Sequence, residues 1–336
     1  MGKGCGDKMK KIFTLMTIFL FSAAIAHADG DAGYAGAFLR NGIAARPMGM
    51  GGAYTAVAEG PEATYYNPAG IGFTLKSSVS MSYKSMSLDR HLSQVAVAFP
   101  IRNEAAMAVS WINAGVSNVP STGESRESLG DVANNENAFA ASFSKAINGS
   151  IAVGGSLKYL QQKLDITSSF TIGVDVGVLA RIKKLVSLGV VVQNIGSIYR
   201  VDGGKEWTGG KSYDEKFPLL FKLGAAGHLF DDKLIPSVDF EKSDKMNARY
   251  RAGAEYWFVK KTSKDVPDED EEGKIVTVVE TVRWAGLRAG LDGNLPTFGA
   301  SYFFFIKTIS AGLEYAYLVG QQGTSASHLL TLKLGF

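Results

Sequence analysis

Cysteine is almost absent from this sequence. Its single cysteine, Cys5, precedes the apolar stretch 12–25, whereas the cysteine of a lipid anchor would follow such a stretch. If the N-terminal segment is removed on export, the rest of the chain contains no thiol. Disulfides, cysteine nucleophiles and zinc ribbons are then excluded.

Long apolar runs are equally scarce. The stretch 12–25 is preceded by Lys10 and Lys11 and ends in Ala26-His27-Ala28, which predicts a signal peptide at residues 1–28. After it, no run of about 18 apolar residues predicts a transmembrane helix. An exported chain without a helical span is either a secreted β-protein or an outer-membrane barrel.

The sequence also lacks an excess of charge of either sign. Met9 is the more natural start, so residues 1–8 are interpreted as an additional leader. Removal of residues 1–28 takes away four of the 35 Lys and Arg and one of the 32 Asp and Glu, which leaves 31 of each. A chain without net charge has no electrostatic footprint for nucleic acid.

Patterns for catalysis and metal binding are missing as well. The three histidines after residue 28, which are His91, His228 and His328, are far apart in the sequence. Ser93 is close to His91, but no carboxylate partner for a catalytic triad is identifiable. A membrane hydrolase acting through His91 is the least favoured alternative, so we expect no enzyme. The run 268–273 imitates the front of a Ca²⁺ loop, but Val279 stands where the bidentate glutamate is needed. We interpret this run as a solvated acidic turn and expect no metal or cofactor.

What the sequence does contain is alternation. Every second residue from Phe170 to Ile182 is apolar, and the residues between them include Gly173, Asp175 and Arg181. Such alternation is typical of a barrel strand that faces lipid on one side and a polar lumen on the other. Fourteen segments of this kind are expected, at residues 77–85, 91–100, 104–114, 136–147, 149–162, 167–182, 185–195, 217–230, 232–243, 247–260, 274–291, 295–306, 308–319 and 325–336.

The connections between these segments support a membrane barrel. The number of segments is even, the turns on one side are tight, and the long connections 115–135 and 196–215 both fall on the other side. The connection 261–273 is the exception, because it is long but falls on the side of the tight turns. Interfacial aromatic residues are expected at Phe99, Trp111, Tyr302, Phe304, Tyr315 and Tyr317.

The last segment carries the most specific signal. Leu332, Leu334 and Phe336 alternate with polar or small residues up to the C-terminus. An alternating strand with a terminal aromatic residue is the tag that the barrel-assembly machinery reads. We therefore predict an all-β protein, a 14-stranded antiparallel transmembrane β-barrel formed by residues 77–336, in contact with the lipid of a Gram-negative outer membrane.

The stretch 44–72 is dense in Gly and Ala and has no strand pattern. We expect residues 29–76 to form a hatch or plug inside the barrel, and both a movable gate and an inert filler fit this composition. Tyr54 and Val57 are expected to give a short helix its packing face. No strand precedes the glycines and no Lys-Ser/Thr follows them, which rejects a phosphate loop. The hatch candidates are Arg46, Pro47, Gly49, Gly51, Gly52, Asn67 and Pro68.

Charged residues at inward positions are the remaining site candidates, namely Asp175, Arg249, Arg251, Glu255, Arg288 and Glu314. The simpler interpretation is a hydrated polar lining. In the alternative, Arg249 and Arg251 hold a carboxylate or phosphate together. Glu59 or Glu62 would then fix the hatch by pairing with a lumenal arginine.

The run 45–53 and the block 65–70 resemble the N-terminal segment of the PorV/PorQ family, a branch of the FadL-like outer-membrane barrels. Residues 298–299, 313–317 and 328–332 are similar to that family as well. The resemblance implies a 14-stranded barrel with a lumenal hatch. FadL-like members take up fatty acids and other hydrophobic compounds, so it implies transport of a hydrophobic ligand past the long loops. PorV-like members bind exported cargo in type IX secretion, which makes a secretion factor with protein cargo the alternative.

Overall fold

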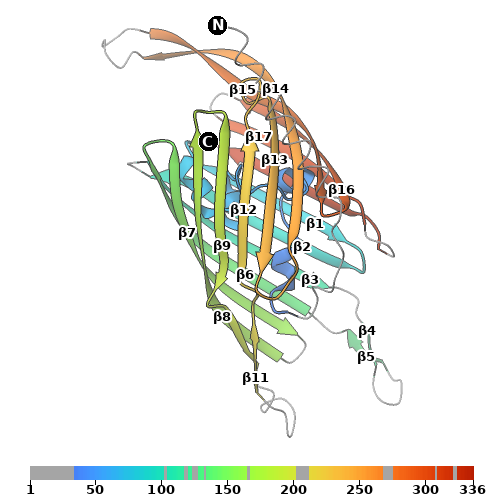
Figure 1. Ribbon diagram of the computed structural model, residues 1–336. Helices are drawn as coiled ribbons and strands as arrows, with labels where there is room; N and C mark the ends of the chain where they lie inside the picture. The colour runs from blue at the N-terminus through green and yellow to red at the C-terminus, as the bar shows by residue number, and fades with distance from the viewer. Residues whose placement is uncertain are drawn as a thin grey trace.

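The structure is a computed structural model that describes residues 34–101, 104–116, 120–122, 128–131, 134–164, 167–201, 212–267, 275–306, 309–320 and 324–336. Within them, fourteen strands form a closed antiparallel barrel (Figure 1). The prediction of a 14-stranded barrel is confirmed. The predicted signal peptide at 1–28 and the acidic run 268–273 lie outside the described residues.

The barrel closes where β1 pairs with β18, for example at Met81 and Leu332. Its strands are β1 (Ser78–Met86), β2 (Arg90–Ile101), β3 (Ala105–Val116), β6 (Asn134–Ile147), β7 (Ile151–Leu164), β8 (Thr167–Ile182), β9 (Val186–Ile195), β12 (Leu220–Gly227), β13 (Leu234–Ser243), β14 (Arg249–Pro267), β15 (Ile275–Asp292), β16 (Leu295–Ile306), β17 (Ile309–Leu318) and β18 (Ser327–Gly335). All but β14 lie close to their expected ranges, because the period-two pattern continues to the ends of most strands.

Two small hairpins that the sequence pattern did not predict lie in the long connections. They are β4 (Pro120–Thr122) with β5 (Ser128–Asp131), and β10 (Ile198–Val201) with β11 (Tyr213–Lys216). Both lie at the end of the barrel away from the C-terminus (Figure 1). Long connections face outward in outer-membrane barrels, so we call this the outer end and the other the periplasmic end.

The outer face of the barrel is apolar, as the alternation predicts. Leu330 and Leu332 are exposed while Thr331 between them is buried. Trp111, Phe139, Tyr159 and Phe170 form a row of ring contacts across four strands near the outer end. Phe258, Trp284, Tyr302 and Phe304 form a second row near the periplasmic end. Two aromatic rows that flank an apolar band are typical of a barrel surrounded by lipid.

Residues 34–76, which we call the hatch, lie inside the barrel (Figure 1). Their helices are η1 (Ala37–Arg40), α2 (Ala45–Gly49), η2 (Gly60–Glu62), α3 (Ala63–Tyr66) and η3 (Pro68–Phe73). None of the helices in the described residues is long or apolar enough to span a membrane. Every residue from 42 to 58 is buried, and four apolar clusters join hatch residues to residues of the barrel wall.

The helix expected around Tyr54 and Val57 is wrong. This segment is a turn in which the Val57 N–H donates to the Tyr54 carbonyl at 3.2 Å. Gly51 and Gly52 have φ of 66° and 78°, a left-handed conformation that ends α2 and prevents a helix from continuing into this segment. Asn67 instead begins η3, where its side chain accepts from the Ala69 N–H at 3.1 Å.

Glycine makes room for the hatch in the barrel wall. Six strands place an inward glycine against it, namely Gly154, Gly177, Gly189, Gly224, Gly253 and Gly290. A Cβ atom at any of these positions would lie 2.2 to 2.8 Å from a hatch atom. Any larger residue there would push the hatch away from the wall. The glycines that alternate with apolar residues in the sequence therefore mark the surface on which the hatch sits.

Residues 261–267 of the connection expected at 261–273 are strand, so that boundary was wrong. Residues 259–267 of β14 pair with residues 275–283 of β15 beyond the rest of the barrel. We call these two segments the arm, and they project at the periplasmic end (Figure 1). The frequent Lys, Asp and Pro residues of the first segment suggested a loop, but its partner segment is rich in β-branched residues, which favour strands.

Adding one methyl group at Gly154 should destabilise the protein. A Cβ there would lie 2.6 Å from the Pro68 carbonyl group, and overpacking of this kind costs about 1–3 kcal/mol. We expect Gly154→Ala to lower the free energy of unfolding in urea by that amount. Gly155→Ala is the control, because the nearest atom to its Cβ is 3.5 Å away. Equal stability of the two variants would contradict the proposed packing.

Candidate functional site

An apolar cluster fills the outer part of the lumen. Phe38 of η1 is 3% exposed and packs in a cluster with wall residues that include Leu92, Ile112 and Leu160. Tyr199 of β10 and Phe217, which directly follows β11, complete this cluster. The first hatch segment therefore occupies the apolar space that an incoming hydrophobic molecule would meet first.

Two small cavities lie beside this segment, and Leu39, Tyr65 and Leu220 line both of them. Each has a volume of about 20 Å³, which accommodates roughly one water molecule. The Tyr65 hydroxyl donates to the Leu39 carbonyl and accepts from the Gly42 N–H at 3.2 Å. Tyr65 thus holds the first hatch segment between the two cavities, and the lumen is closed in this conformation.

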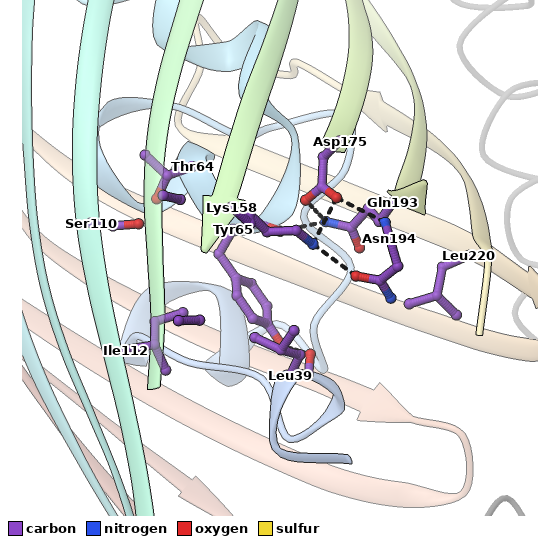
Figure 2. Close-up of a pocket in the computed structure, with 12 residues that line it drawn as sticks. Leu39, Thr64, Tyr65, Ser110, Ile112, Lys158, Asp175, Gln193, Asn194 and Leu220 are labelled. Carbon is purple, nitrogen blue, oxygen red and sulfur yellow. Dashed lines mark hydrogen bonds and ion pairs between the residues drawn. The ribbon is translucent and has the colours of Figure 1, made fainter. Parts of the chain in front are cut away.

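Asp175, a candidate from the sequence, lies at the first cavity (Figure 2). Its carboxylate accepts from Lys158 Nζ at 2.7 Å and from the Asn194 N–H at 2.9 Å. Gln193 donates to the Tyr65 carbonyl at 2.8 Å. Asp175 sits at an irregularity in the β8–β9 pairing, so its side chain satisfies a backbone group that the ladder leaves free.

Arg249 and Arg251 do hold a carboxylate, but it belongs to the wall. Arg249 Nη2 lies 2.7 Å from Asp292 Oδ2, and Arg251 Nε lies 2.9 Å from Asp292 Oδ1. Arg251 also contacts Glu241 at 2.8 Å, and Lys222 contacts the same carboxylate at 3.3 Å. Sequence reasoning missed Asp292 and Glu241. The signal that could have found Asp292 is the β14–β15 register, which places it opposite Arg251.

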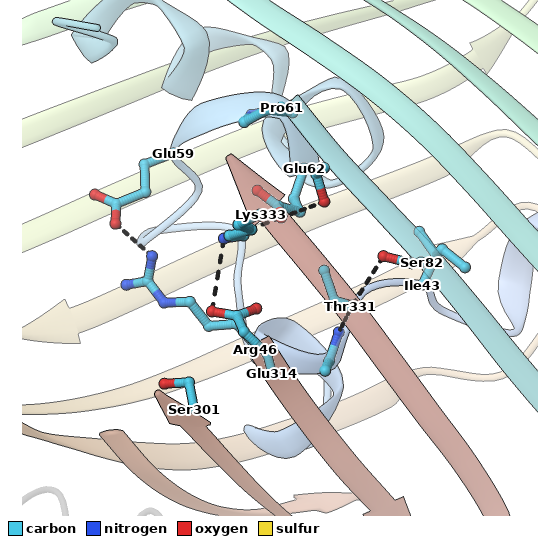
Figure 3. Close-up of polar contacts among 12 residues, drawn as sticks. Ile43, Arg46, Glu59, Pro61, Glu62, Ser82, Ser301, Glu314, Thr331 and Lys333 are labelled. Atoms are coloured by element: carbon cyan, nitrogen blue, oxygen red, sulfur yellow. Dashed lines mark hydrogen bonds and ion pairs between the residues drawn. The ribbon is translucent and has the colours of Figure 1, made fainter. Parts of the chain in front are cut away.

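A chain of charges of alternating sign joins the hatch to the wall toward the periplasmic end. Its members, which we call the latch, are in order Glu62, Lys333, Glu314, Arg288, Glu255, Arg46 and Glu59. Figure 3 shows the contacts of Lys333 with Glu62 and Glu314 and the contact of Arg46 with Glu59. The nitrogen and oxygen atoms of neighbouring members are separated by 2.6 to 3.9 Å, except in the contact between Arg46 and Glu59, which is shorter. The latch brings together three of the sequence candidates from the wall, Glu255, Arg288 and Glu314, with Arg46 of the hatch.

Arg46 is the centre of the latch. Its Nε and Nη2 donate to the two oxygens of Glu255 at 2.9 and 2.6 Å, a bidentate pair. Its guanidinium also lies over the rings of Tyr54 and Trp257, at 5.4 and 5.3 Å from their centroids. The N–H of Ala45, the preceding residue, donates to Thr331 Oγ1 at 2.8 Å, which fixes the start of α2 against β18.

Glu59 is the member of the latch that water reaches most readily, because its side chain is 40% exposed. Arg283 and Arg181 lie 3.8 and 4.0 Å from it. Its partial burial raises the pKa of the Glu59 carboxyl, but the charges of Arg46, Arg283 and Arg181 outweigh burial and hold that pKa below its usual range. Glu59 is therefore ionised at neutral pH and is the exposed end of an otherwise buried ion chain.

One hydrogen-bonded triad outside the hatch has the residue types of a serine hydrolase. Ser187 Oγ lies 2.8 Å from His228 Nε2, and His228 Nδ1 lies 2.7 Å from Asp232 Oδ1. Ser187 is only 1% exposed, and neither cavity reaches it. We interpret the triad as a tie between a periplasmic turn and β9. Sequence reasoning considered His91 instead, which stacks on Tyr83.

The described residues contain no group of His, Cys, Asp and Glu side chains arranged to hold a metal ion. Their fold and lumenal segment define a class, the membrane-spanning β-barrels closed by an internal N-terminal hatch. No protein-family model and no curated protein matches the sequence.

Solved structures give the particular fold. The Pseudomonas putida toluene transporter TodX matches with a TM-score of 0.57 at 12% identity, over 88% of this chain and 98% of the other. A Pseudomonas aeruginosa FadL homologue matches at 0.54 and 12%, over 88% and 98%. The CymD monoaromatic hydrocarbon channel matches at 0.52 and 12%, over 88% and 96%. The chain has the FadL-like barrel fold.

Removal of the central arginine should loosen the hatch. Arg46→Ala leaves Glu255 and Glu59 without their main partner, and a broken buried pair costs about 3–5 kcal/mol. We expect a loss of that size in urea unfolding, together with entry of a large antibiotic that the intact outer membrane excludes. Arg200→Ala is the control, because Arg200 is 86% exposed and 4.0 Å from Asp214. Equal stability of the two variants would argue against the latch.

The buried triad should be unreactive. We expect a fluorophosphonate probe to leave the purified protein unlabelled in an intact-mass measurement, because the Ser187 hydroxyl is shielded. Labelling at Ser187 that disappears in His228→Ala would contradict a purely structural role.

Proposed function

We propose that this chain transports uncharged hydrophobic small molecules across the outer membrane. The observation that carries the proposal is the charge balance around the cavities. The cations that the wall contributes there, Lys158, Lys222 and Arg251, each pair with a wall carboxylate. A ligand carboxylate would have to displace one of these internal partners and leave it buried without a counter-charge. The lumen therefore favours ligands without charge.

The apolar cluster at the outer end supports the same ligand class. Phe38, Ile112 and Leu160 present buried hydrocarbon surface at the point where the lumen meets the outer side. A hydrophobic ligand that takes the place of Phe38 would bury a similar apolar area. In this mechanism the first hatch segment is an internal competitor of the ligand.

The contacts of the hatch suggest an order of movement. The first segment, residues 34–42, is held by hydrogen bonds to its backbone, from Lys84 to the Asn41 carbonyl and between Tyr65 and the backbone at Leu39 and Gly42. Residues 44–73 are held by the buried latch and by close contact with wall glycines. We infer that a ligand displaces the first segment, and that release into the periplasm needs a second step at the latch. Its exposed end, Glu59, is the point at which that step begins.

The names of the structural neighbours support this proposal in a general way. TodX is described as a toluene transporter and CymD as a monoaromatic hydrocarbon channel. They make small aromatic hydrocarbons the sensible first test ligands.

Ligand binding to the purified protein tests the proposal. Phe38→Ala removes the internal competitor, so we expect toluene to bind roughly tenfold more tightly than to the wild type. Phe99→Ala is the matched control, because Phe99 lies on the outer face of the barrel at 36% exposure. A long-chain fatty acid should bind weakly to all three proteins. Tighter binding of the fatty acid than of toluene, or no effect at Phe38, would contradict the proposal.

A role in type IX secretion is the second candidate. It is supported by the resemblance of the runs 45–53 and 65–70 to the PorV/PorQ family, and these runs include Arg46 and Tyr65. This role requires that the genome encode the other secretion components and that deletion of the gene trap cargo in the periplasm. An unchanged secretome in the deletion strain would remove it.

A further inference from the structure

The arm extends beyond the part of the barrel that is surrounded by lipid. The β13–β14 pairing ends at Tyr256, and the β15–β16 pairing begins at Ala285. Past these points, residues 259–267 and 275–283 pair only with each other, over a length of about 30 Å at the rise of a β-strand. The second aromatic row, which includes Phe258 and Trp284, lies at the base of the arm. The arm therefore projects into the periplasm.

A two-stranded ribbon of this kind is poorly supported by itself. Isolated hairpins are marginally stable in water, and both edges of the arm leave main-chain groups unpaired by the barrel. Natural proteins protect such edges with lysine, proline or charged residues. The β14 segment follows this rule, since its sequence contains Lys260, Lys261, Lys264 and Pro267.

The β15 edge lacks that protection. Its sequence from 275 to 282 is IVTVVETV, which contains neither lysine nor proline, has Glu280 as its single charged residue and otherwise consists of residues that favour strands. On the same side, residues 303–306 of β16 pair with β17 but not with β15. The free edges of β15 and β16 therefore border the same gap, which can accept another strand by main-chain hydrogen bonding.

We propose that the outer edge of β15, from Ile275 to Trp284, is the docking site for an extended segment of a periplasmic protein, which adds to the arm as a further strand. The arm recognises this partner mainly through the partner's backbone. The partner binds β15 rather than β14 because the β15 edge lacks lysine and proline. Its location beyond the aromatic row means that a soluble periplasmic protein can reach it without entering the membrane.

The docking edge is connected to the latch. Arg283, in the last residue pair of the arm, lies 3.8 Å from Glu59 of the hatch. Its guanidinium is also 5.3 Å from the centroid of the Trp257 ring. The guanidinium of Arg46, which belongs to the hatch, lies over the same ring. A strand bound along β15 would act next to the exposed end of the latch. This coupling, unlike docking itself, rests on the proposed transport function.

Site-specific photo-crosslinking in intact cells tests the docking site. A photoreactive residue is placed at Thr281 on β15 or at Lys261, its exposed cross-strand partner on β14. We expect a crosslink to one periplasmic protein from position 281 and at least a tenfold lower yield from position 261. Equal yields, or crosslinks to lipid alone, would overturn the proposal. A product with the mass of two copies of this chain would overturn it as well, because the occupant would then be a second copy.

Proline substitutions test whether the main chain makes the contact. Neighbouring N–H groups of a strand point to opposite edges, so of Thr281→Pro and Val282→Pro only one blocks the outer edge. For this experiment the photoreactive residue is placed at position 280. In the proline variant that blocks the outer edge, we expect the crosslink yield to fall at least tenfold while the barrel remains heat-modifiable on gels. Retention of the crosslink in both proline variants would overturn strand addition. Toluene binding by the purified variants distinguishes the two proposals, since docking can fail while transport stands.

Discussion

The hatch depends on one buried ion pair, the bidentate contact between Arg46 and Glu255. A guanidinium inside a barrel is tolerated only when its charge and its donors are satisfied, and Glu255 is fully buried with it. Arg288 shares the same carboxylate at 3.1 Å, so the pair extends into the wall. Breaking this contact would leave Glu255 with Arg288 alone and Arg46 with Glu59 alone, so residues 44–73 resist partial displacement.

Two kinds of contact divide the hatch into parts that resist movement differently. Residues 44–73 combine buried charges with backbone contact against wall glycines, and such contact leaves no room for partial displacement. Residues 34–42 rely on Phe38 and on hydrogen bonds from their backbone to Tyr65 and Lys84. A hydrophobic ligand can therefore displace the outer segment, because the free energy gained when the ligand binds is close to the free energy lost when the segment leaves. The inner part needs an additional trigger, and the exposed Glu59 and the adjoining arm lie where one can act.

The barrel could be predicted from the sequence because each strand carries its own signal. Residues 327–335 alternate so regularly that the outward positions of Leu330 and Leu332 follow from the sequence alone. The latch could not be predicted, because Arg46 and Glu255 are 209 residues apart and meet only once the register of every strand is known. The same limit hid Asp292, which occupies the site expected to bind an external carboxylate. The arm was missed because its charged first segment is a strand only through its partner.

Hydrogen exchange of the hatch amides, measured with and without toluene in the lipid-embedded protein, tests the central claim most directly. Without ligand, we expect the amides of residues 44–58 to exchange as slowly as those of the barrel strands, because the whole segment is buried. With toluene, exchange should rise in residues 34–42 and stay unchanged in residues 44–58. A rise that begins in residues 44–58, or no rise anywhere in the hatch, would contradict a closure in which the outer segment yields first and the latch holds the rest.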